Sequence, residues 1–242
     1  MMKVNGITKS FGDNIVLKNI SFDLIKGITA LLGENGAGKT TLLRILCGFI
    51  EPDSGNVSIN ETSVSNNRIK YLGSIGYMQE ISAMYDYLNV YEFLCLCANL
   101  RINSPNEVLG EIKKCVNTFA LQNVIWQKCN TLSKGYKKRI ELAAAFLGKP
   151  EILLLDEPTE GLDPHQKQNI RKIIKDYAAE HIVLISTHML EDVEILADSI
   201  LLLHNAEILH HCSIKDFKLI DNSNLLSYFI KNTKNRGEYA EI

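Results

Sequence analysis

The most informative stretch of this chain is Gly33-Glu34-Asn35-Gly36-Ala37-Gly38-Lys39-Thr40, which fits the pattern G-x-x-x-x-G-K-[ST]. An apolar run, 28–32, precedes it and predicts a strand, and apolar residues at helical spacing follow it over 42–46. Glycines let the backbone of such a loop turn its N–H groups inward, and the helix behind the loop presents its positive end to phosphate. The stretch therefore predicts a strand–loop–helix unit that binds nucleotide phosphates.

Two side chains of this loop carry the predicted chemistry. Lys39 would neutralise the β/γ phosphate oxygens of a bound nucleotide, and the Thr40 hydroxyl would coordinate Mg²⁺, which keeps several waters and needs few protein ligands. The alternative is a glycine-rich turn before an ordinary helix, but a chance match in a chain of this length has odds on the order of one in a hundred. We predict a phosphate site formed by Gly33, Glu34, Asn35, Gly36, Ala37, Gly38, Lys39 and Thr40.

Two adjacent carboxylates, Asp156 and Glu157, directly follow a second apolar run, Ile152–Leu155. Buried parallel strands deliver functional groups at their carboxyl ends, where ligands bind. We expect Asp156 to hold Mg²⁺ through water, and Glu157, which points the other way along the pleat, to polarise an attacking water. The alternative is a surface turn with solvated acids, which the phosphate loop in the same chain disfavours.

A histidine follows a third aliphatic run, 182–185, and should reach the same edge of the sheet as Asp156. The imidazole of this residue, His188, could bond the γ-phosphate or the attacking water. A single histidine at a strand end is ordinarily structural, and the shared edge with Asp156 is what makes His188 a candidate. We therefore predict Glu157 and His188 as the catalytic residues.

The composition, 242 residues with 46% apolar and 22% charged, is typical of a folded globular chain. A net charge of −2 leaves no overall basic field, so we expect no nucleic-acid partner. The apolar stretch 94–100 is far shorter than the roughly 20 residues that cross a bilayer, and the first residues do not read as a secretory signal. We expect a cytoplasmic protein. Six scattered cysteines without a C-x-x-C pair predict neither a metal site nor a redox site.

Apolar patterning divides the chain into a core and an insertion. Short apolar runs separated by glycine turns predict strands in the first third, helical spacing dominates the middle, and a strand–helix–strand pattern then returns. That last pattern indicates a parallel sheet covered on both faces. We predict a single α/β domain over 1–242, with its core at 1–81 and 151–205, a helical subdomain at 82–150 and a tail at 206–242.

The predicted helical subdomain contains Leu132-Ser133-Lys134-Gly135-Tyr136-Lys137-Lys138-Arg139. This segment resembles the signature loop of ATP-binding-cassette (ABC) transporters, and it lies between the phosphate loop and Asp156. Over about residues 2–211 the chain therefore resembles the nucleotide-binding subunit of an ABC transporter. The resemblance implies a P-loop NTPase core with a parallel sheet flanked by helices, an N-terminal antiparallel β part and a helical subdomain insertion.

The resemblance also implies further site residues. Phe11 occupies the position of an aromatic side chain that stacks on adenine, and Gln79 resembles the glutamine that links Mg²⁺ and water to the helical subdomain. Ser133 and Gly135 would close on ATP held by residues Gly33 to Thr41 of another copy, which adds Thr41 to the predicted phosphate site. Ser133 is placed as a helix N-cap. ATP would then lie between two ATPase subunits, in a homodimer or a heterodimer.

The function implied by the resemblance is ATP hydrolysis that powers translocation through a separately encoded membrane permease, on the inner face of the cell membrane. The usual L-S-G-G-Q is altered here, because Lys134 replaces a glycine and Tyr136 a glutamine. Variants with lysine at this place resemble single-module ATPases of exporters, so we expect export. The basic cluster of Lys134, Lys137, Lys138 and Arg139 could contact anionic lipid or a partner, but we expect it to form a solvated helix face.

Two other functions fit parts of the sequence. A soluble ABC ATPase could act as a nucleotide-driven switch in translation or DNA metabolism, but such proteins usually carry two modules or a long coiled-coil insertion, and we find neither. An unrelated phosphoryl-transfer kinase would need an acceptor site, for which the sequence offers no candidate.

Overall fold

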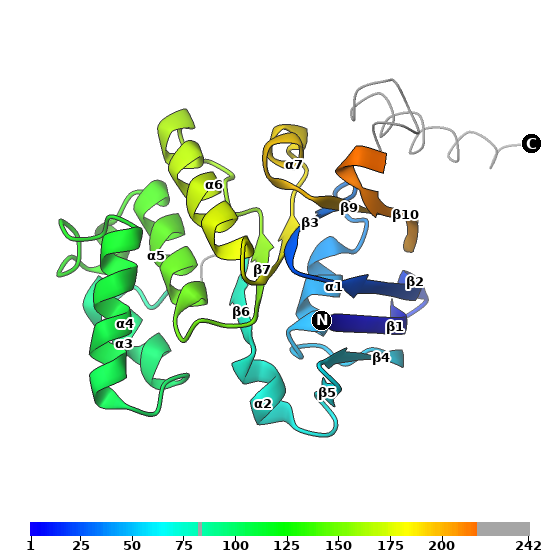
Figure 1. The fold of residues 1–242 in the computed structure, drawn as a ribbon, viewed down its shortest axis with the longest axis horizontal. Coiled ribbons are helices and arrows are strands. Elements are labelled where there is room, and N and C mark those ends of the chain that lie inside the picture. The colour runs from blue at the N-terminus through cyan, green and yellow to red at the C-terminus, as the bar shows by residue number, and fades with distance from the viewer. Residues whose placement is uncertain (82–83, 217–242) are drawn as a thin grey trace, which may run out of the picture.

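The computed structural model describes residues 1–81 and 84–216, which form two β-sheets and the helices around them (Figure 1). The first sheet is antiparallel, with the strand order β2-β1-β4-β5. Its strands are β1 (Met2–Phe11), β2 (Asn14–Leu24), β4 (Ser54–Ile59) and β5 (Thr62–Ser63). This sheet is the antiparallel N-terminal part that the resemblance implied.

The second sheet has the strand order β10-β9-β3-β8-β7-β6 and is parallel except for β10. Every residue of β7 and β8 is buried, as expected of aliphatic strands covered on both faces. Its strands are β3 (Gly27–Leu32), β6 (Ile75–Met78), β7 (Ile152–Asp156), β8 (Ile182–Ser186), β9 (Ser199–His204) and β10 (Glu207–Ser213). The predicted α/β fold class is confirmed.

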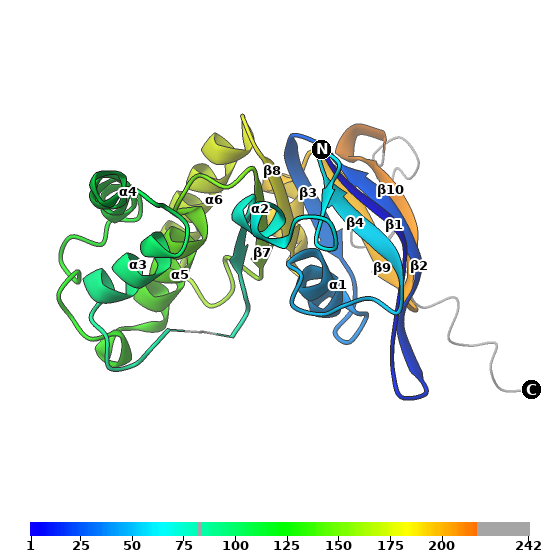
Figure 2. The ribbon, with the colours of Figure 1, turned by 90° about the horizontal axis from the view of Figure 1, so that it is seen from below.

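Helix α1 (Lys39–Leu46) lies between the two sheets (Figure 2). Leu42, Leu43 and Leu46 are fully buried and belong to one apolar cluster with residues of β1 and β7. Burial of three leucine side chains contributes several kcal/mol, at about 1.5–3 kcal/mol each, so the helix that follows the phosphate loop is firmly held.

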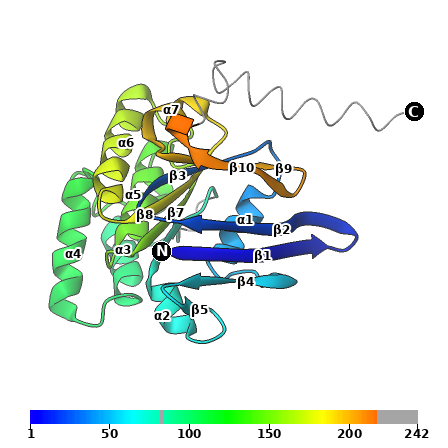
Figure 3. The ribbon, with the colours of Figure 1, turned by 45° about the vertical axis from the view of Figure 1, so that its right-hand side comes forward.

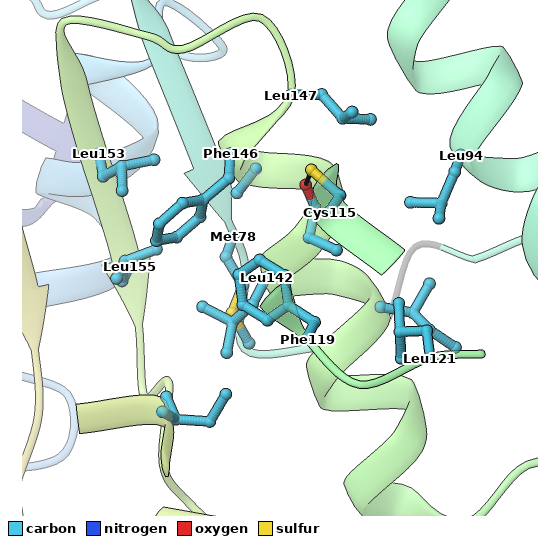
Figure 4. Packing of buried hydrophobic residues seen from close by; sticks show 14 of the residues in the cluster. Met78, Leu94, Cys115, Phe119, Leu121, Leu142, Phe146, Leu147, Leu153 and Leu155 are labelled. Carbon is cyan, nitrogen blue, oxygen red and sulfur yellow. Dashed lines mark hydrogen bonds between the residues drawn. The ribbon is translucent and has the colours of Figure 1, made fainter. Parts of the chain in front are cut away.

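Most of the remaining helices pack together on the far side of the parallel sheet (Figures 1 and 3). Helix α6 lies next to β8, and the middle of the chain folds into a helical group in which Phe119 and Phe146 pack edge to face, with centroids 5.2 Å apart (Figure 4). These helices are α3 (Val90–Asn99), α4 (Pro105–Thr118), η1 (Cys129–Thr131), α5 (Lys134–Phe146) and α6 (Pro164–Ala178). Two short helices lie elsewhere, α2 (Arg68–Gly73) and α7 (Leu190–Leu196). Within the described ranges, no helix is both long enough and apolar enough to cross a membrane.

The mainly parallel sheet extends beyond residue 205, the predicted end of the core. Residues 207–213 form β10, which pairs with β9 along its length, and Ile208 packs against the cluster around α1. Hydrogen bonding to β9 is what joins this segment to the sheet, and the segment contains few apolar residues that would have revealed it. The rest of the predicted tail, 217–242, lies outside the described residues.

The expectation of a solvated basic face at 137–139 is wrong for Lys138, which is 5% exposed. Burial lowers the pKa of its ammonium group, and the carboxylates of Glu141 and Glu160 oppose that shift. Lys138 lies on α5 one turn after Gly135, on the side of the helix that packs into the molecule. Helical periodicity alone did not distinguish this lysine from its solvated neighbours.

Candidate nucleotide-binding site

An open cavity of about 610 Å³ lies where the carboxyl ends of β3, β7 and β8 meet. Its walls are formed by the loops that leave these strands and β6, by the first turn of α1 and by the β1–β2 hairpin. Ten of its thirteen lining residues were predicted from the sequence: Phe11, Asn35, Gly36, Gly38, Lys39, Thr40, Thr41, Asp156, Glu157 and His188. The structure therefore brings residues from four distant segments of the chain to one cavity.

The phosphate loop encloses its own lysine. Lys39 Nζ donates hydrogen bonds to the backbone carbonyls of Gly33 at 2.7 Å and Glu34 at 3.0 Å. Burial lowers the pKa of this ammonium group, and Glu157 and Asp156 oppose that shift. The backbone of Gly38 has φ of 104°, and a Cβ atom there would lie 2.8 Å from the carbonyl oxygen of Val16, so only glycine fits. Glu34 and Ala37 line a second hollow beside the loop, which shares Asn35 and Gly36 with the main cavity.

Thr40 and Asp156 are two of the three residues predicted to hold Mg²⁺, Thr40 as a ligand and Asp156 through water; Gln79 is the third. Thr40 Oγ1 donates to Asp156 Oδ2 over 3.0 Å, which joins the start of α1 to the end of β7. A hydroxyl and a carboxylate are hard oxygen donors, so this pair fits Mg²⁺. In the described part of the chain, no group of three or more His, Cys, Asp or Glu side chains could hold a metal ion, and an ion that keeps most of its waters needs no such group.

Glu157 is buried and held by the segment that follows β8. Its Oε2 accepts a hydrogen bond from Thr187 Oγ1 at 3.1 Å, and its Oε1 accepts from the His188 N–H at 3.0 Å. The Nδ1 atom of His188 lies 2.7 Å from the same Oε1. The two predicted catalytic side chains are thus in direct contact, and His188 is half exposed beside the cavity.

Six predicted residues do not line this cavity: Gly33, Glu34 and Ala37 of the phosphate loop, and Gln79, Ser133 and Gly135. Gln79, which follows β6, is partly buried, and its neighbour Glu80 lines the cavity instead. Ser133 and Gly135 lie at the start of α5, where Ser133 is the N-cap and accepts a hydrogen bond from the Tyr136 N–H at 3.4 Å. Gly135 is buried under the amide side chain of Gln166.

Sequence reasoning missed three residues of the cavity wall, Val16, Glu80 and Glu160. Glu80 and Glu160 lie in the segments that leave β6 and β7, so the rule that drew attention to Asp156 also applied to them. Val16 is placed by the tight β1–β2 hairpin, in which Phe11 pairs with Asn14. Only the strand pairing reveals that Val16 lies at the cavity.

The family model described as "ABC transporter" matches residues 17–160. This chain belongs to the ABC transporter family. Its relatives include two proteins described as uncharacterized ABC transporter ATP-binding proteins. YdbJ of Bacillus subtilis is 36% identical and matches 89% of this chain and 70% of its own length. MJ1023 of Methanocaldococcus jannaschii is 35% identical and matches 93% of this chain and 85% of its own length.

Longer family members and solved structures complete the comparison. The human cholesterol transporter ABCA5 is 36% identical over 81% of this chain, which corresponds to 12% of the length of ABCA5. A solved structure described as the ATP-binding subunit of an ABC transporter is 27% identical, with a TM-score of 0.90 over 97% of this chain and 100% of its own. A dimeric cassette, MJ0796, has the same fold at 23% identity, with a TM-score of 0.81 over 88% of this chain and 99% of its own. This ABC chain thus has the fold of ATP-binding subunits.

Proposed function

We propose that this ABC chain hydrolyses ATP to ADP and phosphate and so powers a transporter. The observation that carries the proposal is the single cavity lined by the phosphate loop, Asp156, Glu157 and His188. Lys39 neutralises phosphate oxygens, and Thr40 and Asp156, assisted by Gln79, hold Mg²⁺, which when bound neutralises charge on the phosphates. Glu157 accepts a proton from the attacking water, and His188 contacts the γ-phosphate or that water.

Adenine would stack on Phe11 in this proposal. The ring is 52% exposed at the end of β1, and the Lys9 ammonium lies 5.6 Å from its centroid. Stacking of a base on an aromatic ring contributes about 1–3 kcal/mol. We predict that Phe11→Ala raises the Kd for ATP by about tenfold, which corresponds to about 1.4 kcal/mol. Isothermal titration measures this change, with Phe49→Ala, an exposed ring outside the cavity, as the control. An unchanged Kd for Phe11→Ala would exclude stacking.

We further propose that two subunits, identical or different, close over ATP. Ser133 and Gly135 lie outside their own chain's cavity, so their predicted contact with phosphate requires a second copy. In this view the core, at 1–81 and 151–213, holds the nucleotide, and the subdomain at 82–150 carries the residues that reach across to the other subunit. Dimerisation with ATP in the Glu157→Gln variant, measured by light scattering, tests this arrangement, and a monomer at saturating ATP would overturn it.

The partner that would use the work is a membrane permease, with the chain bound to it on the cytoplasmic face and export as the direction of transport. The family and the resemblance of Lys134-containing loops to exporter ATPases support this proposal. We predict that the tagged chain, purified from solubilised membranes, retains a protein with several apolar segments of about 20 residues. Recovery only with ribosomes or DNA would instead favour the soluble switch.

A further inference from the structure

The carboxylate of Glu157 is held almost entirely by one short segment, Thr187 to Met189, which links β8 to α7. Thr187 is 1% exposed, and its hydroxyl donates to Glu157 Oε2 over 3.1 Å. The proposed chemistry assigns no role to Thr187, because this residue does not line the cavity. Among the described residues, its hydroxyl bonds the Glu157 carboxylate and the Met189 backbone N–H.

The direction of the Thr187 hydroxyl is determined by its neighbours. The Met189 N–H donates to Thr187 Oγ1 at 3.0 Å, so this oxygen is already an acceptor. A hydroxyl has a single hydrogen, and that hydrogen is therefore directed at Glu157 Oε2. The Thr187 N–H donates to the Leu31 carbonyl on β3 at 3.2 Å, which anchors the residue to the sheet. Hydrogen bonds linked in such a chain strengthen one another.

The two carboxylate oxygens of Glu157 differ in how many further hydrogen bonds they can accept. Oε1 is within hydrogen-bond distance of both the His188 N–H and His188 Nδ1, whereas Oε2, within the described ranges 1–81 and 84–216, is bonded only to Thr187. Each carboxylate oxygen offers about two acceptor positions. Oε2 therefore keeps a position for a proton from water, and Thr187 determines where that oxygen lies.

The backbone conformation of Glu157 is also fixed by its neighbours. Its φ of 48° lies in the left-handed region, which costs a non-glycine residue about 1 kcal/mol or more. The Glu157 N–H donates to the Ser186 carbonyl at 2.9 Å, so a main-chain bond to β8 and side-chain bonds to the segment directly after it hold the residue in this conformation. Such strain is retained where the surroundings fix it.

We propose that Thr187 is a positioning residue for ATP hydrolysis, which orients Glu157 Oε2 toward the attacking water through its hydroxyl. This role rests on the ATPase function proposed above. A displacement of about 1 Å in a reacting group can cost about a hundredfold in rate. Loss of the hydroxyl should therefore act on kcat and leave ATP binding intact, since Thr187 does not contact the nucleotide cavity.

The test compares Thr187→Val with Thr187→Ser. Valine keeps the shape and removes the donor, and we expect kcat to fall by about 10- to 100-fold with KM for ATP within about twofold. Serine keeps the donor and should restore kcat to near the wild-type value. Thr29→Val is the matched control, because Thr29 is a buried β3 threonine whose hydroxyl bonds Ser199 at 2.9 Å, away from Glu157. It should leave kcat and KM unchanged.

A second comparison separates positioning from general structural damage. In a Glu157→Gln background, Thr187→Val should lower the residual rate of single-turnover hydrolysis by less than about twofold, because the group it orients is gone. A wild-type or raised kcat in Thr187→Val, or an equal loss in both backgrounds, would overturn the positioning role while leaving the ATPase function intact. Wild-type protein without any ATPase activity would instead overturn the proposed function, and the role of Thr187 with it.

Discussion

Glu157→Gln should lower kcat for ATP hydrolysis by about a thousandfold, because loss of a general base costs about 10²–10⁴ in rate. Glutamine has nearly the same shape and keeps an oxygen that accepts from Thr187 or His188, but it cannot take a proton from water. The Kd for ATP should stay within about twofold, since only an interaction made in the transition state is removed. Phosphate release under saturating ATP, with nucleotide titration alongside, measures both quantities.

A matched control for this variant lies at the other end of the same strand. Glu151 precedes β7, is exposed and accepts a hydrogen bond from the Asn60 side chain at 2.9 Å. Glu151→Gln makes the same chemical change about a strand's length from the cavity and should keep the wild-type kcat. If Glu157→Gln retained full turnover, the proton of the attacking water would have to go elsewhere, and Glu157 would lose its assigned role.

Local sequence patterns predicted the strand–loop–helix unit and the strand-end residues because their determinants lie close together in the chain. The phosphate loop needs glycines at fixed spacing, and Asp156 and His188 need only an aliphatic strand before them. The parallel register of β7 and β8 then pairs Asp156 with Ser186 and brings these strand ends together. Patterning alone therefore indicated most of the cavity wall.

Contacts between side chains from distant segments of the chain could not be predicted from the sequence. In the sequence, Thr187 is one more residue at the end of an apolar strand, and only the structure shows that its hydroxyl donates to Glu157. Lys138 has the same helical spacing as solvated lysines, yet it faces inward. Gln79 and Glu80 differ by one position after β6, so pattern reasoning could not decide which of them lines the cavity.

Asp192→Ala should lower the free energy of unfolding by about 3–5 kcal/mol, the usual cost of leaving one buried charge without its partner. Asp192 is 1% exposed on α7. Its Oδ1 accepts from Arg171 Nε at 2.7 Å and lies 2.5 Å from Nη2, while its Oδ2 accepts from the hydroxyl of Thr159. Urea unfolding followed by circular dichroism measures the change. Glu191→Ala is the control, because Glu191 is 60% exposed and its 2.9 Å pair with Arg171 should contribute only about 0–1 kcal/mol.

The physical basis of this prediction is that Arg171 loses its buried carboxylate partner and keeps the exposed Glu191, and a double variant isolates this effect. Replacing both members of a buried ion pair with apolar residues of similar volume is often neutral, so Arg171→Met with Asp192→Leu should recover much of the stability lost in Asp192→Ala. Equal destabilisation in the single and double variants would mean that the Thr159 bond, rather than the charge, dominates. The same network joins the loop after Glu157 to the helix after His188, so Asp192→Ala should also lower kcat at temperatures where the variant is still folded.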